Sequence, residues 1–228
     1  MKKKLVFFFI LFWIFSLADI AALYVGENAW HNLIKPVLIP TLMLPLLFGK
    51  IVSKFSHIIL LGLFFSFCGD LFLLYDEVKS NFFIYGLICF LLTHIIYIIY
   101  FNKIKPTQQS LLRKYPWIAA LVAAYGVSLV QFLYPHLGAM KIPVIIYALV
   151  ICIMFLYSLH AFVVVNKPAN SYFVLGALFF VSSDSLLAIN KFYTPFNYAG
   201  IWIMLTYCAA QFFIVLAVCK RVGIQNEK

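Results

Sequence analysis

The run "HIILLGLFFSFCGDLFLLY", His57 to Tyr75, has 19 residues and carries one carboxylate, Asp70. A helix of about 20 mostly apolar residues crosses the hydrocarbon core of a bilayer, so this run predicts a membrane span. The rest of the chain has the same character, because 65% of its 228 residues are hydrophobic and only 11% are charged. A soluble domain is about half apolar and about a quarter charged, so we expect this chain to lie in a membrane.

Apolar runs of this kind recur along the whole chain and predict an all-α, polytopic membrane protein. We expect a single transmembrane domain over residues 1–228, with eight helices at about 5–25, 33–49, 57–75, 82–101, 116–134, 143–165, 171–190 and 196–219. The first run has a basic start like that of a signal peptide, but no clear small-x-small cleavage site follows it, so we interpret it as a retained helix. The second run contains three prolines and is expected to be kinked.

The basic residues predict how these spans are oriented. With the N-terminus in the cytoplasm, 13 Lys and Arg residues fall on the inner side and four on the outer side. This positive-inside distribution predicts both termini in the cytoplasm. The net charge of +10 is spread between apolar runs, so we expect no nucleic-acid partner. The short connections suit a multi-pass protein of a bacterial inner (cell) membrane, with an intracellular eukaryotic membrane as the alternative.

A weak internal repeat relates the two halves of the chain. The segment "GLFFSFCGDLFLLY" aligns with "GALFFVSSDSLLAI", and the alignment matches Gly62 with Gly176 and Asp70 with Asp184. Four spans in each half would make the halves parallel repeats about an axis along the membrane normal. Chance similarity between apolar segments is the alternative interpretation.

Polar side chains from several spans fall at one depth below the predicted outer surface. Asp70 and Asp184 each lie about five residues, or roughly 8 Å, from the outer end of their span. The same layer contains Asp19, Lys35, Tyr147 and Asn190. Ionisable groups inside a span cost free energy and face the protein interior, so they are candidates for function. The alternative is structural: a hydrogen bond to a neighbouring helix, or, for Lys35, a side chain that reaches the interface.

Three further polar residues lie deeper in the predicted spans. His94 falls past the middle of the fourth span toward the inside, where an interhelical hydrogen bond is the alternative to a catalytic role. Tyr207 and Gln211 lie one turn apart on the last span and either line the floor of a cavity or join helices. We find no GxSxG, HExxH, P-loop or dinucleotide-binding motif. The five cysteines form no CxxC pair and are interpreted as small buried hydrophobes.

Six segments, taken in order, resemble the YhhN family of integral membrane proteins, which includes the lysoplasmalogenases. They are "KPVLIP" at Lys35, "GDLFLL" at Asp70, "GLICFLLTHIIYIIYF" around His94, "IPVIIYALVICIM" around Tyr147, "GALFFVSSDSLLAINKF" around Asp184 and "LTYCAAQFFIV" around Gln211. The resemblance covers nearly the whole chain. It implies eight spans and hydrolysis of the vinyl ether bond of lysoplasmalogens, which yields a fatty aldehyde and glycerophosphoethanolamine or glycerophosphocholine.

The implied chemistry suits two carboxyl groups. Cleavage of a vinyl ether requires an acid that protonates the β-carbon and a base that deprotonates water. We therefore hypothesise that Asp70 and Asp184 are the catalytic acid/base pair and share one proton in a low-dielectric pocket. We expect no cofactor and no metal. Which aspartate carries the proton stays open at this point, as do the preferred headgroup and chain length and the oligomeric state.

The remaining polar residues are assigned to substrate binding. The predicted set is Lys35, Asp19, Tyr147, Asn190, Tyr207, Gln211 and His94. In this hypothesis Lys35 contacts the phosphate of a lysophospholipid substrate, and a tyrosine or Asn190 orients the glycerol or the water. One alternative is a small eight-span transporter with an intramembrane Asp relay. Another is a membrane protein that binds lipids without cleaving them.

Overall fold

The computed structural model describes residues 3–48, 55–76, 80–104, 111–162, 165 and 167–225, and in these ranges the chain is helical. The long helices are α1 (Lys3–Val25), α2 (Asn28–Phe48), α3 (Ser56–Leu74), α4 (Ser80–Lys103), α6 (Trp117–Leu133), α7 (Lys141–Phe162), α8 (Ala169–Ala188) and α9 (Ala199–Gln225). The short elements are α5 (Leu111–Lys114), η1 (Tyr134–His136), η2 (Gly138–Met140) and the π-helical turn η3 (Ile189–Tyr193).

The described part of the chain contains eight helical segments long and apolar enough to cross a membrane. This confirms the prediction of an all-helical chain with eight candidate spans. The orientation in the membrane and the internal repeat stay predictions.

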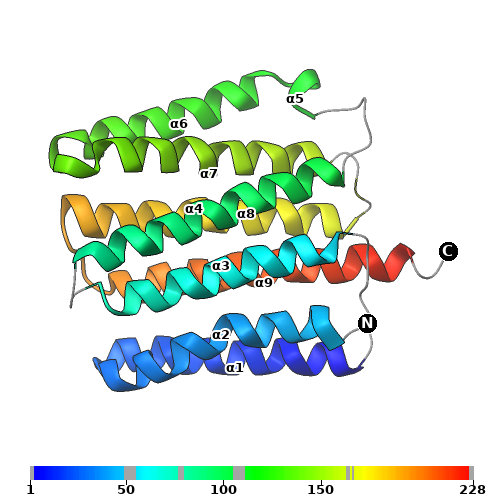
Figure 1. Cartoon of the computed structure of the whole chain (residues 1–228). Helices are drawn as coiled ribbons and strands as arrows, with labels where there is room; N and C mark the ends of the chain where they lie inside the picture. Colours follow the sequence, from blue (N-terminus) through cyan, green and yellow to red (C-terminus); the bar gives the residue numbers. More distant parts are fainter. Residues whose placement is uncertain are drawn as a thin grey trace.

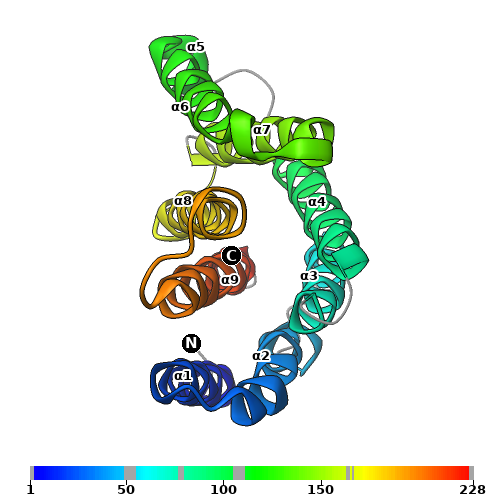
Figure 2. The ribbon, with the colours of Figure 1, turned by 90° about the vertical axis from the view of Figure 1, so that its left-hand side faces the viewer.

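Seven of the long helices form a closed ring in the order α1, α2, α3, α4, α7, α8 and α9, and α9 returns to pack against α1 (Figure 2). Helix α6 lies outside this ring against α7 and is the least buried of the eight candidate spans. Both termini lie at one end of the bundle, and the turns that follow α1, α3 and α8 lie at the other end (Figure 1). The last residues of α1, α3 and α8 therefore lie together at the end of the bundle away from the termini.

Two glycines bring neighbouring ring helices close together. A Cβ atom on Gly69 of α3 would lie 2.8 Å from the ring of Phe90 on α4. A Cβ atom on Gly176 of α8 would lie 2.6 Å from Ile214 and 3.0 Å from a backbone oxygen of α9. Small residues at such contacts are typical of helix packing in membranes, where close approach replaces the hydrophobic effect between helices. Asp70 and Asp184 follow in the same helices and are thereby held against the interior of the ring.

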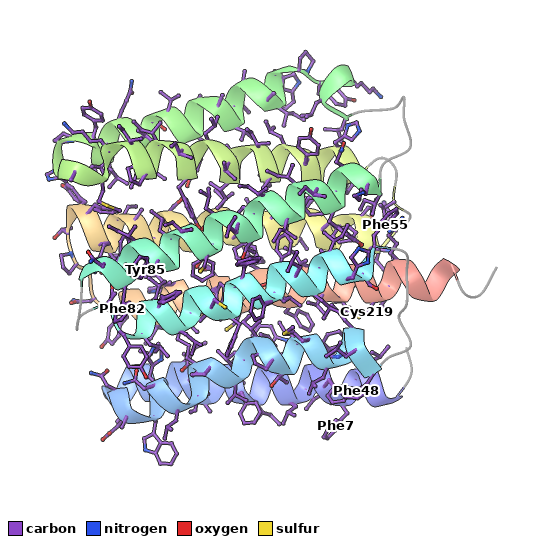
Figure 3. All side chains as sticks on the ribbon, in the orientation of Figure 1. Phe7, Phe48, Phe55, Phe82, Tyr85 and Cys219 are labelled. Atoms are coloured by element: carbon purple, nitrogen blue, oxygen red, sulfur yellow. The ribbon has the colours of Figure 1, made fainter. Side chains whose placement is uncertain are left out.

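Large apolar side chains also cover the outside of the ring. Phe7 on α1, Phe48 on α2 and Tyr85 on α4 are all exposed (Figure 3). A soluble protein rarely leaves so much apolar surface uncovered, whereas in a bilayer these side chains are in contact with lipid.

Helix α2 begins at Asn28, whereas the sequence predicted a start at about residue 33. The prediction considered only the apolar residues, but Gly26, with φ of 81°, makes a tight turn that lets α2 start almost directly after α1. The earlier start has a structural consequence, because it places His31 on the helix, one turn before Lys35.

Candidate functional site

A cavity of about 260 Å³ lies among the ends of the ring helices. Its walls come from α1, α2, α3, α4, α8, η3 and α9. The polar residues that line it are His31, Lys35, Asp70, Asp76, Ser183, Asp184, Asn190, Lys191 and Tyr207. The two aspartates from distant parts of the chain thus line the same cavity. Its lining includes residues near the ends of α1, α3 and α8, and these helix ends lie at the end of the bundle away from the termini (Figure 1).

Asp70 is 3% exposed and is held by a tyrosine of another helix. The Tyr207 hydroxyl on α9 donates a hydrogen bond of 2.6 Å to Oδ2 of Asp70. Nε2 of Gln211 donates to the Tyr207 hydroxyl at 3.3 Å and to Oγ of Ser66 at 2.8 Å. The Tyr97 hydroxyl donates to Oε1 of Gln211 at 3.0 Å. This buried chain of hydrogen bonds fixes Tyr207 and, through it, the Asp70 carboxyl group.

Asp184 is held by donors from two other helices. Its Oδ2 accepts a hydrogen bond of 2.6 Å from the Tyr147 hydroxyl on α7. The same oxygen lies 3.0 Å from Nε2 of His94 on α4. Nδ1 of His94 is buried and has no partner among the described residues, so the ring makes its polar contacts through Nε2, which also lies 3.0 Å from the Tyr147 hydroxyl. The Asp184 side chain is 14% exposed, so it stays accessible from the cavity.

A third aspartate contacts a residue that lines the cavity. Asp19 on α1 is fully buried, and its Oδ1 lies 2.8 Å from Nδ1 of His31 on α2. His31 lines the cavity beside Lys35, and Lys35 and Asp19 lie near enough to Asp70 to act on it electrostatically. Sequence reasoning missed His31 because it placed the residue before the start of the second helix. The signal available was a histidine one turn before the lysine of the "KPVLIP" segment.

An ion pair lines the cavity where α3 ends and η3 begins. Nζ of Lys191 in η3 is 2.7 Å from Oδ2 of Asp76, and it lies 4.9 Å from the centroid of the Phe83 ring. Neither member of this pair was singled out from the sequence. The π-helical turn η3 also contains Asn190, whose side chain lines the cavity and accepts a hydrogen bond from the backbone of Phe196 at 3.4 Å.

A second, smaller cavity of about 40 Å³ adjoins the first. It lies between α4, α7 and α8, and its walls are apolar except for Tyr147 and Asp184. The two cavities share the residues Leu73, Phe90, Asp184 and Leu187. Asp184 is therefore a carboxyl group at the boundary between a polar cavity and an apolar one.

The predicted site residues occupy two positions relative to the polar cavity. Those that line it are Lys35, Asp70, Asp184, Asn190 and Tyr207. The others reach it through a residue that lines it: Tyr147 and His94 through Asp184, Gln211 through Tyr207, and Asp19 through His31. Depth in the membrane had set His94 apart from the outer layer, whereas the structure joins it to Asp184.

Several known proteins are similar to this chain in sequence. The family profile described as YhhN family matches residues 30–218. The chain is 32% identical over 175 residues to "Lysoplasmalogenase TMEM86A" of Bos taurus. It is also 32% identical over 179 residues to the Homo sapiens protein of that name. Each alignment covers 75% of this chain and 69% of the relative. It is 29% identical over 160 residues to "Lysoplasmalogenase TMEM86B" of Rattus norvegicus, covering 70% of this chain and 60% of that relative. No solved structure matches the chain significantly.

Proposed function

This chain belongs to the YhhN family, and from that premise we propose that it is a membrane-embedded lysoplasmalogenase. The observation that carries the proposal is the position of Asp184 between the polar and the apolar cavity. In a lysoplasmalogen the vinyl ether joins the polar glycerophosphate part to the apolar alkenyl chain. A lipid with its polar part in one cavity and the start of its chain in the other would present that bond to Asp184.

The proposed first step is protonation of carbon. Asp70 is almost fully enclosed and accepts one hydrogen bond, an environment that suits the neutral acid. It transfers its proton to the β-carbon of the vinyl ether, the double bond supplies the electrons of the new C–H bond, and an oxocarbenium ion forms. Asp184 has two donors on one oxygen, which suits a carboxylate that stabilises this cation.

Addition of water and collapse of the hemiacetal complete the proposed cycle. Asp184 accepts a proton from the attacking water as the new C–O bond forms. It then returns this proton to the glycerol oxygen as the old C–O bond breaks, while Asp70 takes the proton of the hemiacetal hydroxyl. A fatty aldehyde and glycerophosphoethanolamine or glycerophosphocholine leave, and both carboxyl groups regain their starting protonation states without a cofactor.

The polar cavity supplies partners for the rest of the substrate. Lys35 is placed to attract the phosphate, and Asn190 offers an amide to the glycerol hydroxyl. The apolar cavity is smaller than an alkenyl chain, so entry of the chain must separate the side chains between α4, α7 and α8. The substrate therefore approaches from the membrane rather than from bulk water.

The decisive experiment measures aldehyde release by the purified protein in detergent, with a lysoplasmenylethanolamine as substrate. We expect Asp70→Asn and Asp184→Asn each to lower kcat by about 100-fold or more, because each removes a proton-transfer group. Glu27→Gln, the same change at an exposed residue of the α1–α2 turn, is the matched control. Near-normal turnover in either folded aspartate variant would exclude the acid/base pair. If the wild-type protein releases no aldehyde, the function itself is excluded; a transporter would give that result because it leaves the lipid intact.

A further inference from the structure

The Lys191–Asp76 pair has the form of an occupied ammonium site. The Lys191 ammonium lies between a carboxylate oxygen of Asp76, at 2.7 Å, and the face of the Phe83 ring, at 4.9 Å. A carboxylate together with an aromatic face is a combination that proteins use to bind ammonium ligands. Asp76 and Lys191 both line the polar cavity, so a ligand in that cavity meets both charges.

Separating Lys191 from Asp76 should also require little free energy. Its side chains are 38% and 18% exposed, so water already screens part of the attraction between Lys191 and Asp76. Partly exposed ion pairs of this kind contribute little to stability. Separating the two charges becomes favourable when each of them receives a new partner of opposite sign. A ligand that carries both signs of charge meets this condition, and a singly charged one does not.

We propose that this pair is the headgroup subsite of the lysolipid hydrolase and that it selects a zwitterionic headgroup with a primary ammonium. The inference rests on the proposed function. On binding, the ammonium of the lipid replaces Lys191 at Asp76 and Phe83. The released Lys191 then pairs with the phosphate, which Lys35 approaches from α2 on the same cavity. Lys191 and Asp76 therefore each have a partner of opposite charge before and after the exchange.

The exchange predicts an order of preference among headgroups. An ethanolamine headgroup has N–H groups that replace the hydrogen bond from Lys191 to Asp76. A choline headgroup has no N–H group, so it can only approach the Phe83 ring and leaves Asp76 without a hydrogen bond. An N-acetylated ethanolamine has no cation, so it leaves Lys191 paired with Asp76 and its phosphate receives no contact from Lys191. The preference should therefore fall from ethanolamine to choline to N-acetylethanolamine.

The test compares three lysoplasmalogens that share one alkenyl chain and differ in these headgroups. In the wild-type protein we expect kcat/KM to fall several-fold at each step of the series, mainly through KM. Asp76→Asn should raise KM for the ethanolamine lipid to that of the N-acetyl lipid and leave kcat nearly unchanged. Lys191→Gln should instead raise KM for the ethanolamine and choline lipids, because only a zwitterionic headgroup releases Lys191 to pair with the phosphate. Lys141→Gln is the matched control, since Lys141 lies 4.4 Å from the Tyr134 ring and does not line the cavity.

The subsite can be tested apart from turnover. Lysophosphatidylethanolamine and its N-acetyl derivative contain no vinyl ether, and their binding is measured by the rise in Tm of the purified protein. We expect the wild-type protein to be stabilised more by the first lipid and Asp76→Asn to be stabilised equally by both. Equal stabilisation of the wild-type protein, or an unchanged difference in Asp76→Asn, overturns the headgroup subsite. Loss of aldehyde release with the binding difference intact would instead overturn only the proposed reaction.

Discussion

Asp70 and Asp184 line one cavity, and each carboxyl group accepts a hydrogen bond of 2.6 Å from a tyrosine that belongs to another helix. Asp70, in the first half of the chain, is held by Tyr207 of α9. Asp184, in the second half, is held by His94 of α4 and Tyr147 of α7. Each half of the chain therefore contributes a donor to the aspartate of the other half. Assembly of the site requires the whole ring, which explains why no short motif contains it.

Removing the tyrosine hydroxyls should impair catalysis more than binding. Tyr147→Phe deletes one of two donors to Asp184, and Tyr207→Phe deletes the donor to Asp70. A lost hydrogen bond to a buried acceptor costs about 1–3 kcal/mol, so we expect kcat to fall by about 5-fold to 100-fold with a smaller change in KM. Aldehyde release by the purified variants checks this, with Tyr125→Phe as the control, because Tyr125 of α6 hydrogen-bonds Ser185 of α8 and neither aspartate. Unchanged kcat in both variants would contradict the proposed roles.

The fold class follows from the length of the apolar runs. The matched depth of Asp70 and Asp184 in their spans suggested that they line one cavity. The depth of a residue in the membrane does not determine how its helix is rotated about its own axis. It does not determine the order of the helices around the ring either. Both faces of a lipid-exposed helix are apolar, so periodicity does not separate the inner face from the outer one. This is why the contact of His94 with Asp184, and the position of α6 outside the ring, required the structure.

The residues that sequence reasoning missed lie at the ends of helices. His31 lies in the first turns of α2, and Lys191 lies in the π-helical turn after α8. Helix ends are the least certain part of any prediction from sequence, since polar residues there suit both a helix and a loop. Asp76 directly follows α3, and its pairing with Lys191 depends on two segments that are 115 residues apart in the chain.

His94 offers a choice between a hydrogen-bond donor and a proton carrier. Its Nε2 lies 3.0 Å from both Asp184 and the Tyr147 hydroxyl, and its Nδ1 has no partner among the described residues, so no contact on Nδ1 continues a path for protons through the ring. We therefore expect His94→Gln, which keeps an N–H donor, to retain much more activity than His94→Leu. The measurement is kcat for the two variants after their Tm values have been compared. Equal inactivity of two well-folded variants would instead assign proton transfer to the imidazole.

Filling the apolar cavity should block the alkenyl chain and spare the polar site. Ala188 lines the small cavity beside Asp184, and Ala188→Phe would occupy its volume of about 40 Å³. We expect kcat/KM for a long-chain lysoplasmalogen to fall by about 10-fold or more, because overpacking also displaces neighbouring side chains. The control is Ala120→Phe on the exposed side of α6. If Ala188→Phe turns over the lipid as fast as the wild-type protein, the chain must enter elsewhere.

The Asp19–His31 pair should contribute to stability, and removing His31 alone should lower the Tm more than removing both residues. His31→Ala leaves the fully buried Asp19 carboxyl group without the partner at 2.8 Å, whereas the double variant Asp19→Ala/His31→Ala removes both side chains. Breaking a buried pair from one side costs about 3–5 kcal/mol, while removing both partners costs much less. We therefore expect the Tm of the double variant to lie above that of His31→Ala, because the coupling between the two residues is lost. Thermal unfolding in one detergent is measured for the wild-type protein, Asp19→Ala, His31→Ala and the double variant. Strictly additive losses would mean that the contact contributes nothing.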